Sequence, residues 1–129
     1  MKTTNKLIIF ALAITVISLS GCLTVSEITP SLSSQTPFTV ATNEVVKFTA
    51  FVGGSPLEGA TFKVSYVDPN SLINVNDAYA ATMTTIGITN SVGEVSYTIP
   101  TGYIGKRLIY YVEKPSSFNT PGVGIAMVT

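Results

Sequence analysis

The sequence predicts an all-β protein, an antiparallel β-sandwich of about seven strands that follows an N-terminal signal peptide. After residue 37, short runs of alternating apolar and polar residues recur, and turn-forming residues separate them at intervals of about 8–12 residues. Charged residues make up only 11% of the chain, while Thr, Val, Ile and aromatic residues, which favour pleated and half-buried strands, are common. No helical periodicity of apolar residues is evident after residue 22, so we expect no helix there.

The first 21 residues have the three parts of a signal peptide. Lys2 and Lys6 give a basic start, residues 7–19 are apolar except for a threonine and a serine, and the small residues Ser20 and Gly21 follow. A basic region, an apolar core and a small-residue cleavage site are the physical requirements for export and cleavage. We therefore assign residues 1–21 to a signal peptide.

The tetrapeptide Leu19-Ser20-Gly21-Cys22 resembles the lipobox of bacterial lipoproteins. The resemblance implies cleavage between Gly21 and Cys22, and lipid attached to the Cys22 sulfur. Cys22 is the only cysteine, which excludes an intramolecular disulfide. We therefore expect an exported protein that is lipid-anchored to the outer face of a cell membrane.

Two other interpretations of the N-terminal segment stay open. No charge occurs between Lys6 and Glu27, a length close to the roughly 20 residues of a membrane-spanning helix that is not cleaved. Alternatively, ordinary cleavage would release a secreted protein with a free thiol at Cys22.

Residues 22–36 are rich in Ser, Thr and Pro and carry one charge, Glu27. Pro30 and Pro37 argue against a helix. We interpret this segment as the lipidated N-terminus and a tether, with an edge strand possible at residues 23–28, and assign residues 37–129 to the sandwich domain.

The domain contains seven strand-like runs. Alternation is clearest in residues 45–52 and 60–67, and the other runs are 38–40, 82–89, 94–99, 107–113 and 123–128. Residues 68–80 form the longest irregular stretch, and Gly93 lies in a predicted hairpin turn where it is free to adopt positive φ. The residues predicted to face the core are Val46, Phe48, Ala50, Val52, Phe62, Val64, Tyr66, Thr84, Ile86, Ile88, Val95, Tyr97, Ile99, Leu108, Tyr110 and Val112.

Part of this pattern resembles bacterial Ig-like modules. Residues 51–52 are followed by Pro56-Leu57-Glu58-Gly59-Ala60-Thr61-Phe62-Lys63-Val64, which is similar to the junction between the second and third strands of those modules. Gly93-Glu94-Val95-Ser96-Tyr97 and Gly105-Lys106-Arg107-Leu108 match later positions of the family. The resemblance implies an Ig-like sandwich over most of residues 38–129.

The composition argues against catalysis and against nucleic-acid binding. The chain has no histidine, the commonest general base and metal ligand. Removal of Lys2 and Lys6 leaves five basic residues against seven acidic ones, so the mature chain lacks a basic surface for nucleic acid. We expect no enzyme activity, no catalytic residues, no cofactor and no metal. A calcium loop built from Asp68, Asn70, Asn74, Asn76 and Asp77 is the alternative that the oxygen-rich residues suggest.

Aromatic residues in predicted loops are the candidates for recognition. Tyr79, Tyr103 and Phe118 lie in loops, although a loop-anchoring role is the simpler interpretation of Tyr103. We predict a binding or structural module with an adhesion, envelope or accessory role, and a protein or glycan ligand. The alternative is a self-assembling surface subunit that pairs through an edge strand from the uncharged flank 23–38.

Overall fold

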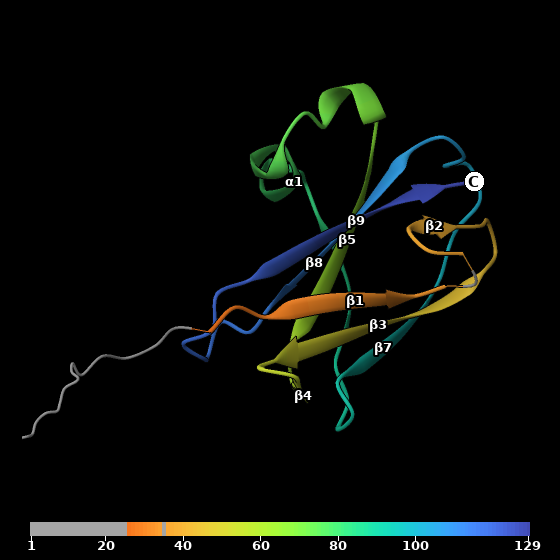
Figure 1. Ribbon diagram of the computed structural model, residues 1–129. Coiled ribbons are helices and arrows are strands. Elements are labelled where there is room, and N and C mark those ends of the chain that lie inside the picture. Colours follow the sequence, from red (N-terminus) through yellow and green to blue (C-terminus); the bar gives the residue numbers. More distant parts are fainter. Residues whose placement is uncertain (1–25, 35) are drawn as a thin grey trace, which may run out of the picture.

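The computed structural model describes residues 26–34 and 36–129, and it has two facing β-sheets (Figure 1). The predicted all-β sandwich is therefore confirmed. One sheet contains β1 (Thr29–Ser33), β3 (Val45–Val52), β4 (Ser55–Pro56) and β7 (Glu94–Thr98), with β3 between β1 on one side and β4 and β7 on the other. The second sheet has the order β2 (Thr39–Val40), β9 (Gly122–Val128), β8 (Arg107–Glu113), β5 (Thr61–Val67) and β6 (Thr84–Ile88). Neighbouring strands are antiparallel except for β2 and β9.

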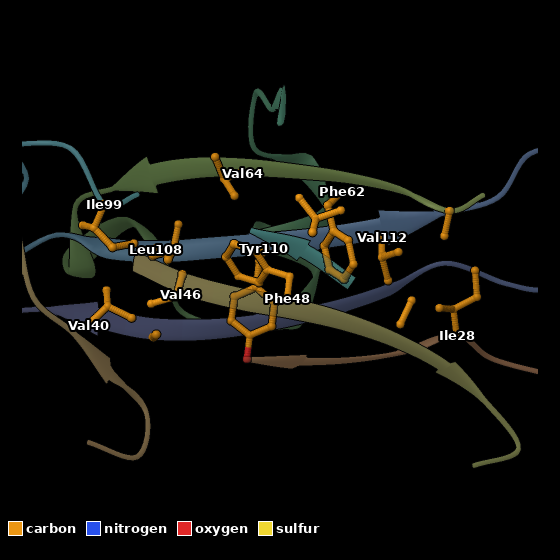
Figure 2. Packing of buried hydrophobic residues seen from close by; sticks show 14 of the residues in the cluster. Ile28, Val40, Val46, Phe48, Phe62, Val64, Ile99, Leu108, Tyr110 and Val112 are labelled. Atoms are coloured by element: carbon orange, nitrogen blue, oxygen red, sulfur yellow. The ribbon is translucent and has the colours of Figure 1, made fainter. Parts of the chain in front are cut away.

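The hydrophobic core lies between the two sheets (Figure 2). At its centre, the Phe48 ring from β3 is stacked on Phe62 from β5, with ring centroids 5.3 Å apart. Phe48 also lies 5.1 Å from Tyr110 and 6.0 Å from Tyr97, measured between ring centroids. The predicted inward faces of β3, β5, β7 and β8 are confirmed. The core cluster extends from Ile28 to Val128, so the chain from Cys22 onward contains all of it.

The segment between β5 and β6 differs from the irregular loop that we expected. It contains the 3₁₀ turn η1 (Pro69–Ser71) and the short helix α1 (Val75–Ala80). Asn74 and Asp77 form a capping box, in which each side chain accepts backbone N–H groups at the helix start. Only Ala78 of the helix is buried, so the sequence carries no apolar stripe that would have predicted it.

The helix covers part of the outer face of the five-stranded sheet. Tyr79 of α1 makes an edge-to-face contact with Tyr111 of β8, with ring centroids 6.1 Å apart. Ala78 and Ile109 are both fully buried although neither belongs to the core between the sheets. Alternation along β8 predicted that Ile109 faces outward, and this cover explains its burial.

Strand β6 differs from its prediction at Ile88. The register with β5 shifts between Phe62 and Lys63: Phe62 pairs with Gly87, whereas Lys63 pairs with Thr85. Ile86 is the extra residue of this β-bulge, and a bulge moves every following side chain to the opposite face. Ile86 therefore still contacts the core, whereas Ile88, which we expected on the same face, is 65% exposed.

The segment expected to be a tether contributes to the sandwich. Ile28 is completely buried, and β1 pairs with β3 from Thr29 opposite Phe51 to Ser33 opposite Lys47. Pro30 and Leu32 are half-buried while their neighbours are exposed, which is the alternation of an edge strand. Proline is tolerated in an edge strand because one side of that strand has no partner, so Pro30 is compatible with β1, which begins just after the edge strand that we allowed at residues 23–28.

The turn predicted at Gly93 is observed, and side-chain hydrogen bonds also fix the turn before β5. Gly93 adopts φ +78° and accepts a hydrogen bond from the Ala50 backbone at 2.9 Å. The side chain of Asn90 closes this turn by accepting from the backbone N–H groups of Val92 and Glu94. The Thr89 hydroxyl donates to the Leu57 carbonyl and accepts from the Ala60 N–H, which fixes the turn before β5.

The sandwich has two ends that are separated by the length of β3. At the Ser26 end, where the described chain begins, Thr120 donates to the Ser26 carbonyl, and the β3–β4 and β6–β7 turns and the loop 114–121 lie at this end. At the Thr129 end, Asn43 donates to Ile99 and Gly105 donates to Val128. Since β3 has eight residues, the two ends are roughly 24 Å apart. Figure 1 shows the start of β1 at one end and the C-terminus at the other.

The N-terminal predictions fall on residues that the structure does not describe. The signal peptide 1–21 and the lipidation site Cys22 both lie outside the described ranges. Within those ranges, no helix is long and apolar enough to cross a membrane.

Candidate binding clefts

A cleft of about 320 Å³ opens at one lateral edge of the sandwich. We call it the tyrosine cleft. It lies between β5 and β6 of one sheet and the end of β7 in the other, and the chain after β7 closes it at the Thr129 end. Its lining residues are Val64, Ser65, Tyr66, Thr82, Thr84, Ile86, Tyr97, Pro100 and Tyr103.

Three tyrosines from three different segments meet in this cleft. The rings of Tyr66 and Tyr103 are stacked, with centroids 4.1 Å apart and an angle of 11° between their planes. The hydroxyls of Tyr66 and Tyr97 are 2.7 Å apart and share a hydrogen bond. Burial, together with the bond to Tyr97, raises the pKa of Tyr66 far above its usual value. Tyr66 therefore remains a neutral phenol at any physiological pH.

Tyr103 combines the two roles that the sequence left open. Its ring packs on Tyr66, and its carbonyl accepts from the Lys106 N–H at 3.0 Å, as expected of a loop-anchoring residue. The residue is still 37% exposed, so part of it is accessible from solvent. Tyr66 and Tyr97 pack against the core as predicted, and they also line the cleft, which the sequence did not show.

The chemistry of the tyrosine cleft suits an uncharged ligand. All nine of its lining residues in the described chain are uncharged, so no side chain of the cleft could pair with a charged group of a ligand. Aromatic rings offer large apolar contact areas, while the tyrosine, threonine and serine hydroxyls offer hydrogen bonds. Six of the nine lining residues carry a hydroxyl, so the cleft offers polar contacts as well as apolar ones. Thr82 and Pro100 join the cleft only through the way the sheets meet, so no sequence signal marked them.

A second cleft, of about 410 Å³, lies at the opposite lateral edge. We call it the β1 cleft. Residues of β1 and the segment that follows it form one wall, and Phe38, which is 80% exposed, lies at its rim. Tyr110 reaches it from the core, and burial raises the pKa of that phenol. This cleft is rich in serine and proline: its lining residues are Pro30, Ser31, Leu32, Ser33, Ser34, Pro37, Phe38 and Tyr110.

The carboxylates of the alternative calcium loop, residues 68–77, accept hydrogen bonds from backbone N–H groups. Asp68 accepts from the Asn70 N–H at 3.0 Å, and Asp77 accepts from the N–H groups of Ile73 and Asn74 at 2.8 and 3.0 Å. The two carboxylates thus cap two separate turns. Within the described ranges, no group of three or more His, Cys, Asp or Glu side chains is arranged so that it could hold a metal ion.

Of the remaining loop aromatics, Tyr79 and Phe118 have different surroundings. Tyr79 contacts Tyr111 on the outer face of the sheet. Phe118 is 86% exposed and lies in the loop 114–121 at the Ser26 end, away from both clefts. The structure therefore brings together Tyr66, Tyr97 and Tyr103, and leaves Phe118 separate.

An ion pair on the outer face of the five-stranded sheet gives a pH-dependent stability. The Lys63 Nζ lies 2.6 Å from a Glu113 carboxylate oxygen, and the Tyr111 hydroxyl donates to the same carboxylate at 3.1 Å. The hydrogen bond from Lys63 holds the pKa of Glu113 below its ordinary value near 4.5. A carboxylate with a lowered folded-state pKa stabilises the fold above its ordinary pKa, and this stabilisation is lost as the pH falls through the folded-state pKa.

We expect Glu113→Gln to lower the free energy of unfolding by about 1 kcal/mol at pH 7, because the pair is partly exposed. The difference from the parent should shrink below pH 4.5 and vanish once Glu113 is protonated in the folded protein. Urea unfolding at a series of pH values checks this. A difference that stays constant down to pH 2 would show that the effect comes from lost contacts and not from the charge.

Comparison of the chain with protein-family models, with curated proteins and with solved structures gave no match.

Proposed function

We propose that this protein is an exported lipoprotein whose Ig-like module is held at the outer face of a cell membrane and binds an uncharged ligand in the tyrosine cleft. The observation that carries the proposal is the position of that cleft. It lies toward the Thr129 end of the sandwich, whereas the chain that leads to Cys22 leaves from the Ser26 end. An anchor at Cys22 would leave the cleft open to the surroundings of the cell.

The strand pairing supports an Ig-like module. In Ig-like sandwiches the second strand pairs with the fifth in one sheet, and the third, sixth and seventh strands form the other. Counting only the strands of five or more residues, β3 and β7 are the second and fifth, and β5, β8 and β9 are the third, sixth and seventh. The pairs β3–β7, β5–β8 and β8–β9 are all present, whereas the fourth strand, β6, departs from the constant-type pattern because it pairs with β5.

Removal of the Tyr103 ring tests the binding site. We expect Tyr103→Ala to weaken ligand binding at least about tenfold, because a central aromatic residue of a binding site commonly contributes more than 1.4 kcal/mol. The protein has no tryptophan, so tyrosine fluorescence can follow titration with a panel of neutral oligosaccharides and uncharged peptides.

The matched control is Ile104→Ala, which removes the neighbouring side chain, 71% exposed, outside the cleft. The affinity of Ile104→Ala for the ligand should equal that of the parent protein. Equal affinity of Tyr103→Ala and the parent for a ligand from the panel would place that ligand elsewhere on the surface.

The intact mass of the detergent-extracted protein from its native host tests the anchor. We expect the mass of residues 22–129 plus acyl groups. A mass equal to the chain from Met1 would mean an uncleaved membrane helix, and the unmodified mass of residues 22–129 would mean plain secretion.

A second candidate function is self-assembly through β1. This strand has β3 on one side and no strand on the other among the described residues, and none of its five residues is charged. Charges on edge strands are a common protection against pairing with another copy. Cross-linking of native membranes distinguishes the two functions, because a ladder of one chain supports assembly, whereas a hetero-partner supports a binding module.

A further inference from the structure

The loop 114–121 is fixed beside the point where the chain leaves the domain. Thr120 accepts a hydrogen bond from the Ile28 N–H at 2.9 Å and donates one to the Ser26 carbonyl at 3.1 Å. Since Ile28 is completely buried, Ser26 and this loop are both held against the core.

Very little chain separates this end of the sandwich from Cys22. Ile28 and β1, which we expected to be part of a tether, are built into the domain. Cys22 precedes Ser26 by four residues, and four residues span at most about 14 Å. Acyl chains on Cys22 would therefore hold the Ser26 end within about 14 Å of the bilayer surface.

This end carries a large apolar side chain that contacts little of the protein. Phe118 is 86% exposed and lies two residues before Thr120. Val92, in the β6–β7 turn at the same end, is 54% exposed. Phenylalanine is one of the residues that enter the boundary between headgroups and acyl chains when a protein lies on a membrane.

We propose that the Ser26 end rests on the lipid bilayer and that Phe118 inserts into its interfacial region. This inference depends on the lipid anchor of the proposed function. One aromatic ring binds a bilayer weakly, but the anchor makes its insertion an intramolecular step with a high effective concentration.

The charges at this end have a negative balance, so they do not attract an anionic bilayer. Glu27 and Glu58 are exposed acids, and Lys114 lies close to Glu58, with its ammonium group donating to the Glu58 carbonyl at 2.9 Å. The contact is therefore apolar, and it fixes the orientation of the domain. Two attachment points, the acyl chains and Phe118, direct the Thr129 end and the tyrosine cleft away from the membrane.

The chain offers a direct test because it has one cysteine and no tryptophan. Residues 22–129 contain the whole core, and their Cys22 thiol can be conjugated to a maleimide lipid in phosphatidylcholine vesicles. In this protein, Phe118→Trp places a single tryptophan in the loop, and tryptophan can be excited selectively at wavelengths that the tyrosines do not absorb. We expect its emission to shift to shorter wavelength and to be quenched by lipids brominated close to the headgroup.

The matched control is Ile104→Trp, an exposed reporter at the Thr129 end, which should show neither the shift nor the quenching. No quenching of Phe118→Trp would overturn the inference, and quenching of Ile104→Trp would show the reverse orientation. Because the conjugation replaces the natural lipid, this test does not depend on lipidation in the cell. The intact mass decides that point separately.

Discussion

Replacement of Phe48 by alanine is expected to lower the free energy of unfolding by about 3–5 kcal/mol, the usual range for a buried phenylalanine. Phe48 is completely buried and its ring contacts Phe62, Tyr97 and Tyr110, which come from both sheets. Its loss would leave a cavity that rigid strands on either side cannot close. A loss of this size is a large part of the 5–15 kcal/mol that stabilises a typical domain.

Phe118→Ala is the matched control because it makes the same chemical change at a site that is 86% exposed. A surface change of this kind should alter stability by less than about 0.5 kcal/mol. Urea unfolding of both variants, followed by circular dichroism, measures the contrast. Similar losses in the two variants would mean that Phe48 does not lie at the centre of the core.

Replacement of Gly124 by alanine is expected to destabilise the protein by about 3 kcal/mol, the upper part of the range for overpacking. Gly124 lies opposite Tyr110 across the β8–β9 pair, and the tyrosine ring covers it. An added Cβ would lie 2.2 Å from two ring carbons. The ring packs against Phe48 on its core side and reaches the β1 cleft on the other, so relief of the clash requires the ring to leave its contact with Phe48.

Gly87→Ala is the matched control, since it also adds a methyl group to a strand glycine that faces the core. Its Cβ would lie 3.0 Å from the end of the Val95 side chain, which can adjust more easily than the Tyr110 ring. The double variant Gly124→Ala with Tyr110→Leu should lose less stability than the sum of its parts, by about 1–2 kcal/mol. Additive losses would show that Gly124 is required for another reason.

Features that depend on local alternation could be predicted from the sequence. Val46, Phe48 and Ala50 in β3, and Phe62 and Val64 in β5, face the core because side chains of a strand point to opposite faces in turn. The same rule was correct for β7 and β8. The turn at Gly93 was also predictable, because glycine, which has no Cβ, adopts positive φ without a steric cost.

The features that prediction missed depend on contacts between distant segments. The sequence showed the alternation in β6 correctly as far as Ile86. The bulge at Ile86 arises from the pairing with β5, and it reverses the face to which Ile88 points. Ile109 is buried because α1 covers it, and α1 has too few buried residues to be recognised from its own sequence. The tyrosine cleft has the same origin, since Tyr66 and Tyr97 alternate like ordinary core residues.

By itself, the sequence determined the fold class and the inward faces of the main strands, because both follow from a two-residue period and from turn residues that act locally. Only the tertiary structure decided that β1 belongs to the sandwich. Pro30 makes this segment a poor strand in isolation, and the pairing with β3, the burial of Ile28 and its hydrogen bond to Thr120 compensate for it. It also decided that Tyr66, Tyr97 and Tyr103 share one cleft, because residues so far apart in the chain meet only when the two sheets pack together.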